Sequence, residues 1–174
     1  MHQFSELVYI STRFSLEAMS KAKSKVIDEL QTNGSTISVK TLQMFQIQKA
    51  IIAIGMFSLF ESIIQYGLNC SNGFEEAKKI ISQSRNTNLS LRFEDFICAI
   101  NVLKHGKGRS YDSLVAKANN LPFKIKLQSE DSFDEGDVAE VSTLIEVDDE
   151  FVLACVKIIE EISIEIRKVK PEYL

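Results

Sequence analysis

Apolar residues recur at helical spacing through the first part of this chain, and this pattern limits the fold more than any other feature. It runs from about Phe4 to Leu30, where Thr32–Gly34 supplies a glycine that can end a helix. A second periodic stretch follows the N-cap side chains offered by Ser35–Ser38 and continues to about Leu68. Two long helices with so short a connection predict an antiparallel helix hairpin.

The rest of the chain predicts shorter helices and one change of pattern. Helices are expected at residues 74–84, 91–105 and 111–119, and a final helix at residues 148–170. After Pro122, the segments 123–128 (FKIKLQ) and 141–147 (VSTLIEV) have the alternation or β-branched content of short strands, joined by a long loop. We therefore expect a mainly α protein with a single domain over residues 1–174. It is a helical bundle built on the long antiparallel hairpin, with a small two-stranded β-excursion between the last two helices.

Residues that make metal and disulfide sites are scarce. The chain has two histidines and three widely spaced cysteines, without a CxxC pair. This set forms no recognisable zinc site, and an odd number of isolated cysteines (Cys70, Cys98 and Cys155) suits a reduced protein. Residues 131–142 have the central glycine of a calcium loop. However, Phe133 and Ser142 stand where an oxygen ligand and a bidentate glutamate are required. No metal and no cofactor are predicted.

Signals for export or membrane insertion are weak. The N-terminal residues lack the basic start, apolar core and small-residue cleavage site of a secretory signal. The most apolar segment, Ala50–Leu68, contains Glu61 and Gln65 and follows Lys49, which favours a buried core helix over a membrane span. The sequence thus predicts a cytoplasmic protein with no membrane partner.

Charge is distributed unevenly along the second half of the chain. Residues 104–126 carry six lysine or arginine side chains against Asp112 alone, whereas residues 127–156 carry ten acidic side chains and no lysine or arginine. One interpretation is an acidic hairpin that compensates a basic turn within the monomer. The other is an acidic flap, at about residues 127–150, that screens or competes for an anion site.

The basic turn Lys104–Ser110 (KHGKGRS) is the strongest candidate site. It lacks the spacing of a P-loop and the third glycine of a dinucleotide loop. Gly106 and Gly108 nevertheless allow a close backbone turn, and a helix that begins near Ser110 would present free N–H groups to an anion. The predicted phosphate- or RNA-binding residues are Lys104, Lys107, Arg109 and Ser110. The alternative is that these residues only end one helix and begin the next, with Ser110 as the N-cap.

His105 is expected on the polar side of its helix. With about 100° per residue, it lies well away from the apolar stripe around Ile100 and on the same side as Asn101, Cys98 and Glu94. It should therefore face solvent or another subunit. Cys98 is two helical turns from His105, too far for a thiol–imidazole pair within one helix.

Two segments, FSLFESIIQ in the second long helix and FEDFICAINVLKHGKGRS later, resemble the HEPN superfamily of prokaryotic helical domains. The resemblance implies a helical bundle, often dimeric, of the kind found in toxin–antitoxin and phage-defence systems. Active members of that family are metal-independent ribonucleases. Their motif is an arginine, commonly a polar residue such as asparagine, and then a histidine, and it pairs across the dimer.

Carried onto this chain, the resemblance assigns catalytic positions to His105, as the motif histidine, and Asn101, as the polar residue before it. The motif is degenerate, because Ile100 stands at the usual place of the arginine, and Ala99 and Cys98 occupy the other allowed positions. Arg92 is no substitute, since it lies roughly 20 Å along the same helix and on a different face.

Three hypotheses follow. The favoured one is a non-catalytic or weakly active HEPN-like module that binds RNA, a nucleotide or a partner protein through the basic turn, as a homodimer formed through its helices. The second is a metal-independent endoribonuclease with His105 as base and a displaced cation. The third is a helical interaction scaffold unrelated to HEPN, in which the basic turn has no binding role.

Overall fold

The computed structural model describes residues 3–84 and 86–171, and the remaining residues of the predicted 1–174 domain lie outside the described part. The expectation of a mainly α protein is confirmed. The described residues form α1 (Phe4–Asn33), α2 (Thr36–Leu68), α3 (Gly73–Gln83), α4 (Thr87–His105), α5 (Arg109–Val115), the 3₁₀ turn η1 (Ala118–Asn120) and α6 (Asp149–Val169).

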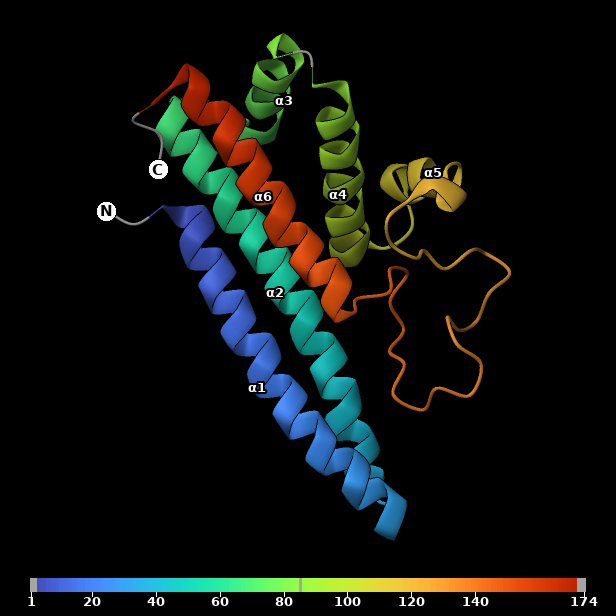
Figure 1. Ribbon diagram of the computed structural model, residues 1–174. Helices are drawn as coiled ribbons and strands as arrows, with labels where there is room; N and C mark the ends of the chain where they lie inside the picture. Colours follow the sequence, from blue (N-terminus) through green and yellow to red (C-terminus); the bar gives the residue numbers. More distant parts are fainter. Residues whose placement is uncertain (1–2, 85, 172–174) are drawn as a thin grey trace.

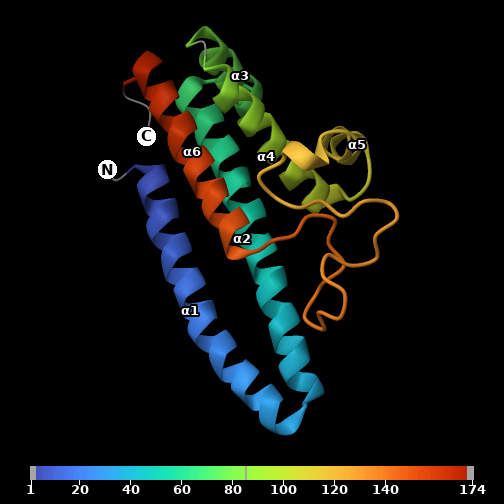
Figure 2. The ribbon, with the colours of Figure 1, turned by 45° about the vertical axis from the view of Figure 1, so that its right-hand side comes forward.

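The three longest helices lie side by side. Helices α1, α2 and α6 contact one another, and α3 and α4 pack against both α2 and α6 (Figures 1 and 2). The chain reverses between α1 and α2 at Gly34, which has φ 50°, and the two helices run in opposite directions from that turn. Their connected ends project beyond the rest of the bundle in both views. Helix α5 and the long segment before α6 lie beside the C-terminal end of α4.

Side-chain caps explain where most helices begin. Ser35, Asn72 and Asp148 each accept a hydrogen bond from a backbone N–H in the first turn of α2, α3 and α6. Helix α4 begins at Thr87, earlier than the expected residue 91, because the Asn86 side chain accepts from the N–H of Leu89 at 3.3 Å. One polar side chain therefore adds a turn to α4.

Aromatic side chains connect the elements of the core. The ring of Phe74 in α3 packs edge-on against Phe93 in α4, with centroids 5.4 Å apart. A second group joins three separate parts of the chain: Phe96, Phe123 and Phe151 lie pairwise 5.3 to 5.7 Å apart. This second group attaches the segment after Pro122 to the middle of α4 and to the first turn of α6.

The predicted two-stranded β-excursion is wrong in its detail. Within the described residues, the two segments form one isolated antiparallel bridge, Ile125 to Ile145, and no strand. The bridge keeps two backbone hydrogen bonds, from the Lys126 N–H to the Leu144 carbonyl at 2.9 Å and from the Glu146 N–H to the Lys124 carbonyl at 3.1 Å. The Lys126 carbonyl, which would accept the next bond of a ladder, accepts the Tyr111 hydroxyl at 2.9 Å. Tertiary contacts therefore replace the ladder.

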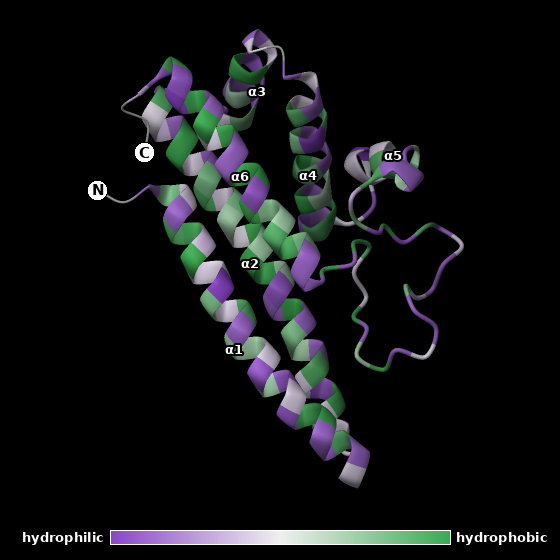
Figure 3. Ribbon diagram, viewed as in Figure 1, coloured by the Kyte–Doolittle hydropathy of each residue, from purple (hydrophilic) through white to green (hydrophobic). Residues whose placement is uncertain are grey.

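Helix α2 has two different faces. Its inner face supplies Phe57, Phe60 and Ile64 to the core, each at most 1% exposed. Its length and composition would also allow it to cross a membrane, and only a third of the most apolar part is buried within the bundle. Hydrophobic residues are dense along its upper half in Figure 3, and several of them face solvent.

Candidate functional site

The basic turn joins α4 to α5. Helix α4 ends at His105, and the Gly106 N–H donates to the Val102 carbonyl at 2.8 Å. Gly106 has φ 74° and ψ −144°, a conformation that side chains disfavour, so a glycine is needed at this position. Lys104, His105, Lys107 and Arg109 are all exposed around it. The turn therefore presents its basic side chains to solvent.

Ser110 is not the N-cap that the sequence suggested. Helix α5 begins at Arg109, and its N-cap is Gly108, with no side-chain cap. Ser110 lies within the first turn, half-buried, where its hydroxyl acts to lower the pKa of the Cys98 thiol. Burial raises the pKa of the Cys98 thiol, and the Ser110 contact only partly offsets this. Cys98 therefore stays protonated near neutral pH and is a poor nucleophile.

The acidic segment compensates other cations than those of the turn. Lys126 pairs with Glu140 at 2.5 Å, and Lys124 pairs with Glu146 at 3.2 Å. Lys117 pairs with Asp95. In the part of the chain that the structure describes, no ion pair involves Lys104, Lys107 or Arg109, although Lys107 lies 5.9 Å from the centroid of the Tyr111 ring. The acidic segment thus compensates Lys124 and Lys126 and not the basic turn, contrary to the first interpretation of the charge pattern.

The other arginine of α4 has a structural contact. Arg92 pairs with Glu161 of α6 at 2.9 Å. This ion pair links α4 to α6, so Arg92 is engaged away from the turn. The position of the missing motif arginine, Ile100, is buried in the core.

A cleft of about 210 Å³ lies between α2, α3 and α4 and reaches Lys104, the first residue of the basic turn. Two of the residues predicted for the site, Asn101 and Lys104, line it. Its apolar lining comes from Phe57, Phe74, Ile97 and Ile100, and its polar lining also includes Ser58, Glu61, Asn72, Glu75 and Lys78. His105, Lys107, Arg109 and Ser110 do not line it. The structure thus divides the predicted residues between the cleft and the exposed turn, with Lys104 and Asn101 on the cleft side.

The close approach of α3 to α2 forms one wall of this cleft. A Cβ atom on Gly73 would lie 2.7 Å from the Glu61 carbonyl oxygen, so glycine is required where α3 begins. Sequence reasoning missed Ser58, Glu61 and Lys78 as site residues. The available signal was Glu61 itself, a half-buried carboxylate within the most apolar segment of the chain.

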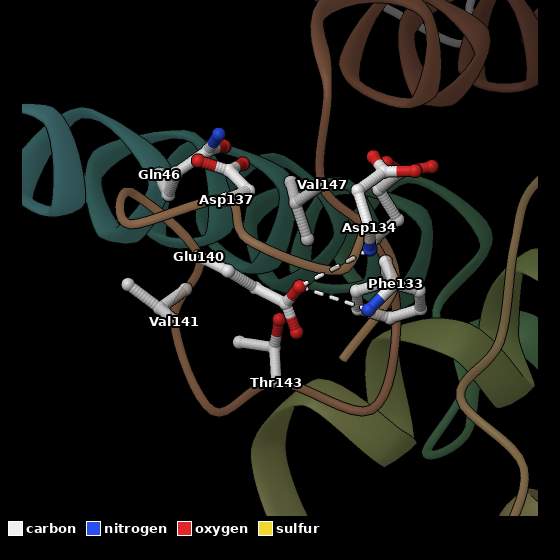
Figure 4. A pocket seen from close by; sticks show the side chains of 9 residues that line it. Gln46, Phe133, Asp134, Asp137, Glu140, Val141, Thr143 and Val147 are labelled. Atoms are coloured by element: carbon white, nitrogen blue, oxygen red, sulfur yellow. Dashed lines mark hydrogen bonds between the residues drawn. The ribbon is translucent and has the colours of Figure 1, made fainter. Parts of the chain in front are cut away.

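A second, smaller pocket of about 40 Å³ lies in the acidic segment, where Asp134, Asp137, Glu140 and Glu146 line it (Figure 4). The Glu140 carboxylate is fully engaged there: it pairs with Lys126 and accepts the N–H groups of Phe133 and Asp134 at 2.8 and 3.4 Å. Among the described residues, no group of three or more His, Cys, Asp or Glu side chains is arranged to hold a metal ion. The bonds of Glu140 connect Lys126 to Phe133 and Asp134 within this loop.

Comparison of the chain with protein-family models, with curated proteins and with solved structures gave no match.

Proposed function

We propose that this protein is a HEPN-like helical module that binds RNA through the basic turn Lys104–Ser110, with little or no catalytic activity. One observation carries the proposal. Lys104, Lys107 and Arg109 are exposed around one turn and have no ion pair among the described residues, while the neighbouring lysines are neutralised by carboxylates. The net charge of the chain is −4, so the molecule as a whole does not attract anions. An anionic partner would be attracted by the local excess of cations at this turn.

RNA fits this turn better than a small anion does. Exposed lysine and arginine side chains on one short segment can each neutralise a different phosphate of a flexible strand. The exposed His105 adds an aromatic, hydrogen-bonding side chain at the same place. A cytoplasmic role in a bacterial defence or stress system would follow from the HEPN resemblance, and free nucleotides or a partner protein are the other ligands that this turn could accept.

The test is RNA binding and its dependence on salt. Wild-type protein should bind short single-stranded RNA, with an affinity that falls steeply as the salt concentration rises. The double variant Lys107→Glu/Arg109→Glu should bind at least tenfold more weakly and with a shallower salt dependence. A matched control is Lys23→Glu/Lys25→Glu, which changes the charge equally on the exposed side of α1. Equal binding by wild type and the turn variant would contradict the proposal and favour the scaffold with no role for the turn.

The second candidate function is metal-independent RNA cleavage, and it is favoured by the exposure of His105 beside three cations that form no ion pair with any described residue. His105 would act as the base for a ribose 2′-hydroxyl, and Lys104, Lys107 or Arg109 would stabilise the charge that develops on the phosphate. Incubation with RNA in the presence of a chelator separates the two functions. We expect wild type to bind RNA and to cleave it slowly or not at all. Cleavage that persists with the chelator and disappears in His105→Ala would assign the ribonuclease function instead.

We also propose that the protein forms a homodimer through its long helices. The outer face of α2 carries exposed Met44, Ile47, Ile51 and Leu59. Between residues 41 and 68 the only charged side chains are Lys49, which is buried and paired with Asp149 at 2.7 Å, and the half-buried Glu61. In a two-fold dimer the same face meets itself, and an uncharged face does so without like-charge repulsion.

A further inference from the structure

The cleft between α2, α3 and α4 has a composition suited to a flat, partly polar ring. Its apolar lining includes two aromatic side chains, Phe57 and Phe74. With about 210 Å³, it is smaller than the roughly 300–1,000 Å³ typical of pockets for drug-sized ligands. A single ring system fits this volume better than a whole nucleotide does. In an RNA strand, that ring is an unstacked base.

The polar side chains of the cleft differ in whether they are free to bind. Glu75 pairs with Lys78 at 2.8 Å, and the Asn72 side chain caps α3 by accepting the Glu75 N–H at 3.1 Å. Glu61 and Asn101 are half-buried in the lining, and no side-chain hydrogen bond or ion pair joins either to another described residue. A half-buried carboxylate and amide without partners are the groups that a ligand would satisfy.

We propose that this cleft binds a guanine base of single-stranded RNA, an inference that rests on the proposed RNA-binding function. A carboxylate accepts hydrogen bonds only, and guanine is the base whose pairing edge carries two adjacent donors, N1–H and the N2 amino group. Adenine and cytosine place a ring-nitrogen acceptor on that edge, and uracil has one donor between two carbonyl oxygens. Glu61 therefore selects guanine, and the Asn101 amide can donate to the guanine O6.

Lys104 connects the cleft to the basic turn. It lines the cleft and lies one residue before the exposed His105. A base seated in the cleft would thus leave its phosphate next to Lys104, and the adjoining nucleotides would follow the cations of the turn. The turn supplies affinity for any strand, and the cleft supplies the preference for one base.

The experiment is a binding titration with labelled oligouridylate and with the same strand carrying one central guanine, adenine or cytosine. We expect the guanine strand to bind roughly tenfold more tightly than the other three, the discrimination typical of a two-bond base contact. Glu61→Gln should remove this preference, measured as the ratio of the affinities for the guanine strand and for oligouridylate. Glu160→Gln, on the exposed side of α6, is the matched control. Asn101→Ala should reduce the preference independently, in case Glu61→Gln perturbs folding, which a thermal melt would reveal.

Each outcome separates the inference from the function on which it rests. If wild type binds all four strands equally and with the expected salt dependence, the guanine inference is overturned and the RNA-binding function stands. If wild type binds no strand, the RNA-binding function fails. Direct titration with GMP and with AMP then tests whether the cleft binds a free nucleotide. Binding of GMP, but not AMP, by a protein that binds no strand would support guanine recognition and overturn RNA as its source.

Discussion

Gly106 shows how a single residue determines the shape of the basic turn. Its φ of 74° and ψ of −144° let the chain leave α4 directly after His105. A Cβ atom added there would meet no other atom within 4 Å, so the need for glycine comes from the backbone conformation alone. Gly108, two residues later, has φ 164°, an extended conformation that other residues adopt, and it too has open space around it.

We therefore predict different effects of alanine at these two positions. Gly106→Ala should lower the free energy of unfolding by about 1–3 kcal/mol, the cost of a strained backbone conformation. It should also weaken RNA binding, because the turn residues lose their arrangement. Gly108→Ala should change the free energy of unfolding by less than about 1 kcal/mol. Denaturant unfolding of both variants checks the pair, and equal stability would refute the conformational argument.

At the scale of an element, the acidic segment before α6 is held by one carboxylate. Burial acts to raise the pKa of Glu140, but the hydrogen bonds from Lys126 and from the N–H groups of Phe133 and Asp134 outweigh it, and the pKa is lowered. These contacts take the place of the strand pairing that the sequence suggested. Because the pKa is lowered in the folded protein, the stabilisation is fully present above the ordinary value of 4.5. It is lost as the pH falls through the folded-state value.

Glu140→Gln tests this contribution. The variant should have a free energy of unfolding about 1–3 kcal/mol lower at neutral pH, the range for loss of a charged hydrogen-bond partner. Its stability should also fall less than that of wild type as the pH drops below 4.5. Unfolding curves across this pH range provide the measurement, with Glu135→Gln, an exposed neighbour in the same segment, as control. Parallel pH profiles for wild type and Glu140→Gln would show that the carboxylate has no such role.

The packing of α3 against α2 also requires a glycine, at Gly73. The reason here is a close contact with α2 and not the backbone conformation. Gly73→Ala places its Cβ atom against the Glu61 carbonyl oxygen, where neither backbone can yield easily. We expect a loss of about 1–3 kcal/mol in the free energy of unfolding, the usual cost of overpacking. Since Glu61 and Phe74 line the cleft, the preference for a guanine strand should fall as well. Gly55→Ala, in open space on α2, is the control, and a stable Gly73→Ala variant with intact base preference would contradict this account.

At the scale of the whole molecule, local signals were readable from the sequence and assembled sites were not. The caps Ser35 and Asp148 act within one turn, so helix starts could be predicted, and Asn86 was missed only because it stands in a polar run. The β-excursion failed because the Tyr111 hydroxyl, which binds the Lys126 carbonyl, comes from outside the expected strands. The cleft combines residues of three helices, and periodicity within one helix does not reveal such a combination.

The outer face of α2 gives the prediction that concerns the molecule as an assembly. Ile47 and Ile51, each at least half exposed, lie one turn apart on the uncharged face. If this face joins two copies, Ile47→Glu/Ile51→Glu places like charges opposite one another and should raise the dimer dissociation constant at least a hundredfold. The helix content and the binding of RNA by the basic turn of each monomer should remain. Sedimentation or light scattering over a range of concentrations measures this. Leu91→Glu/Val169→Glu, which adds equal charge at exposed apolar positions of α4 and α6, should leave the dimer intact. A wild-type protein that stays monomeric at the highest concentration would exclude this face as a self-association surface.

Because a dimer carries two basic turns, a long RNA can contact both turns at once and gain affinity that a short strand does not. The Ile47→Glu/Ile51→Glu variant should therefore lose the added affinity for long RNA while keeping that for short strands.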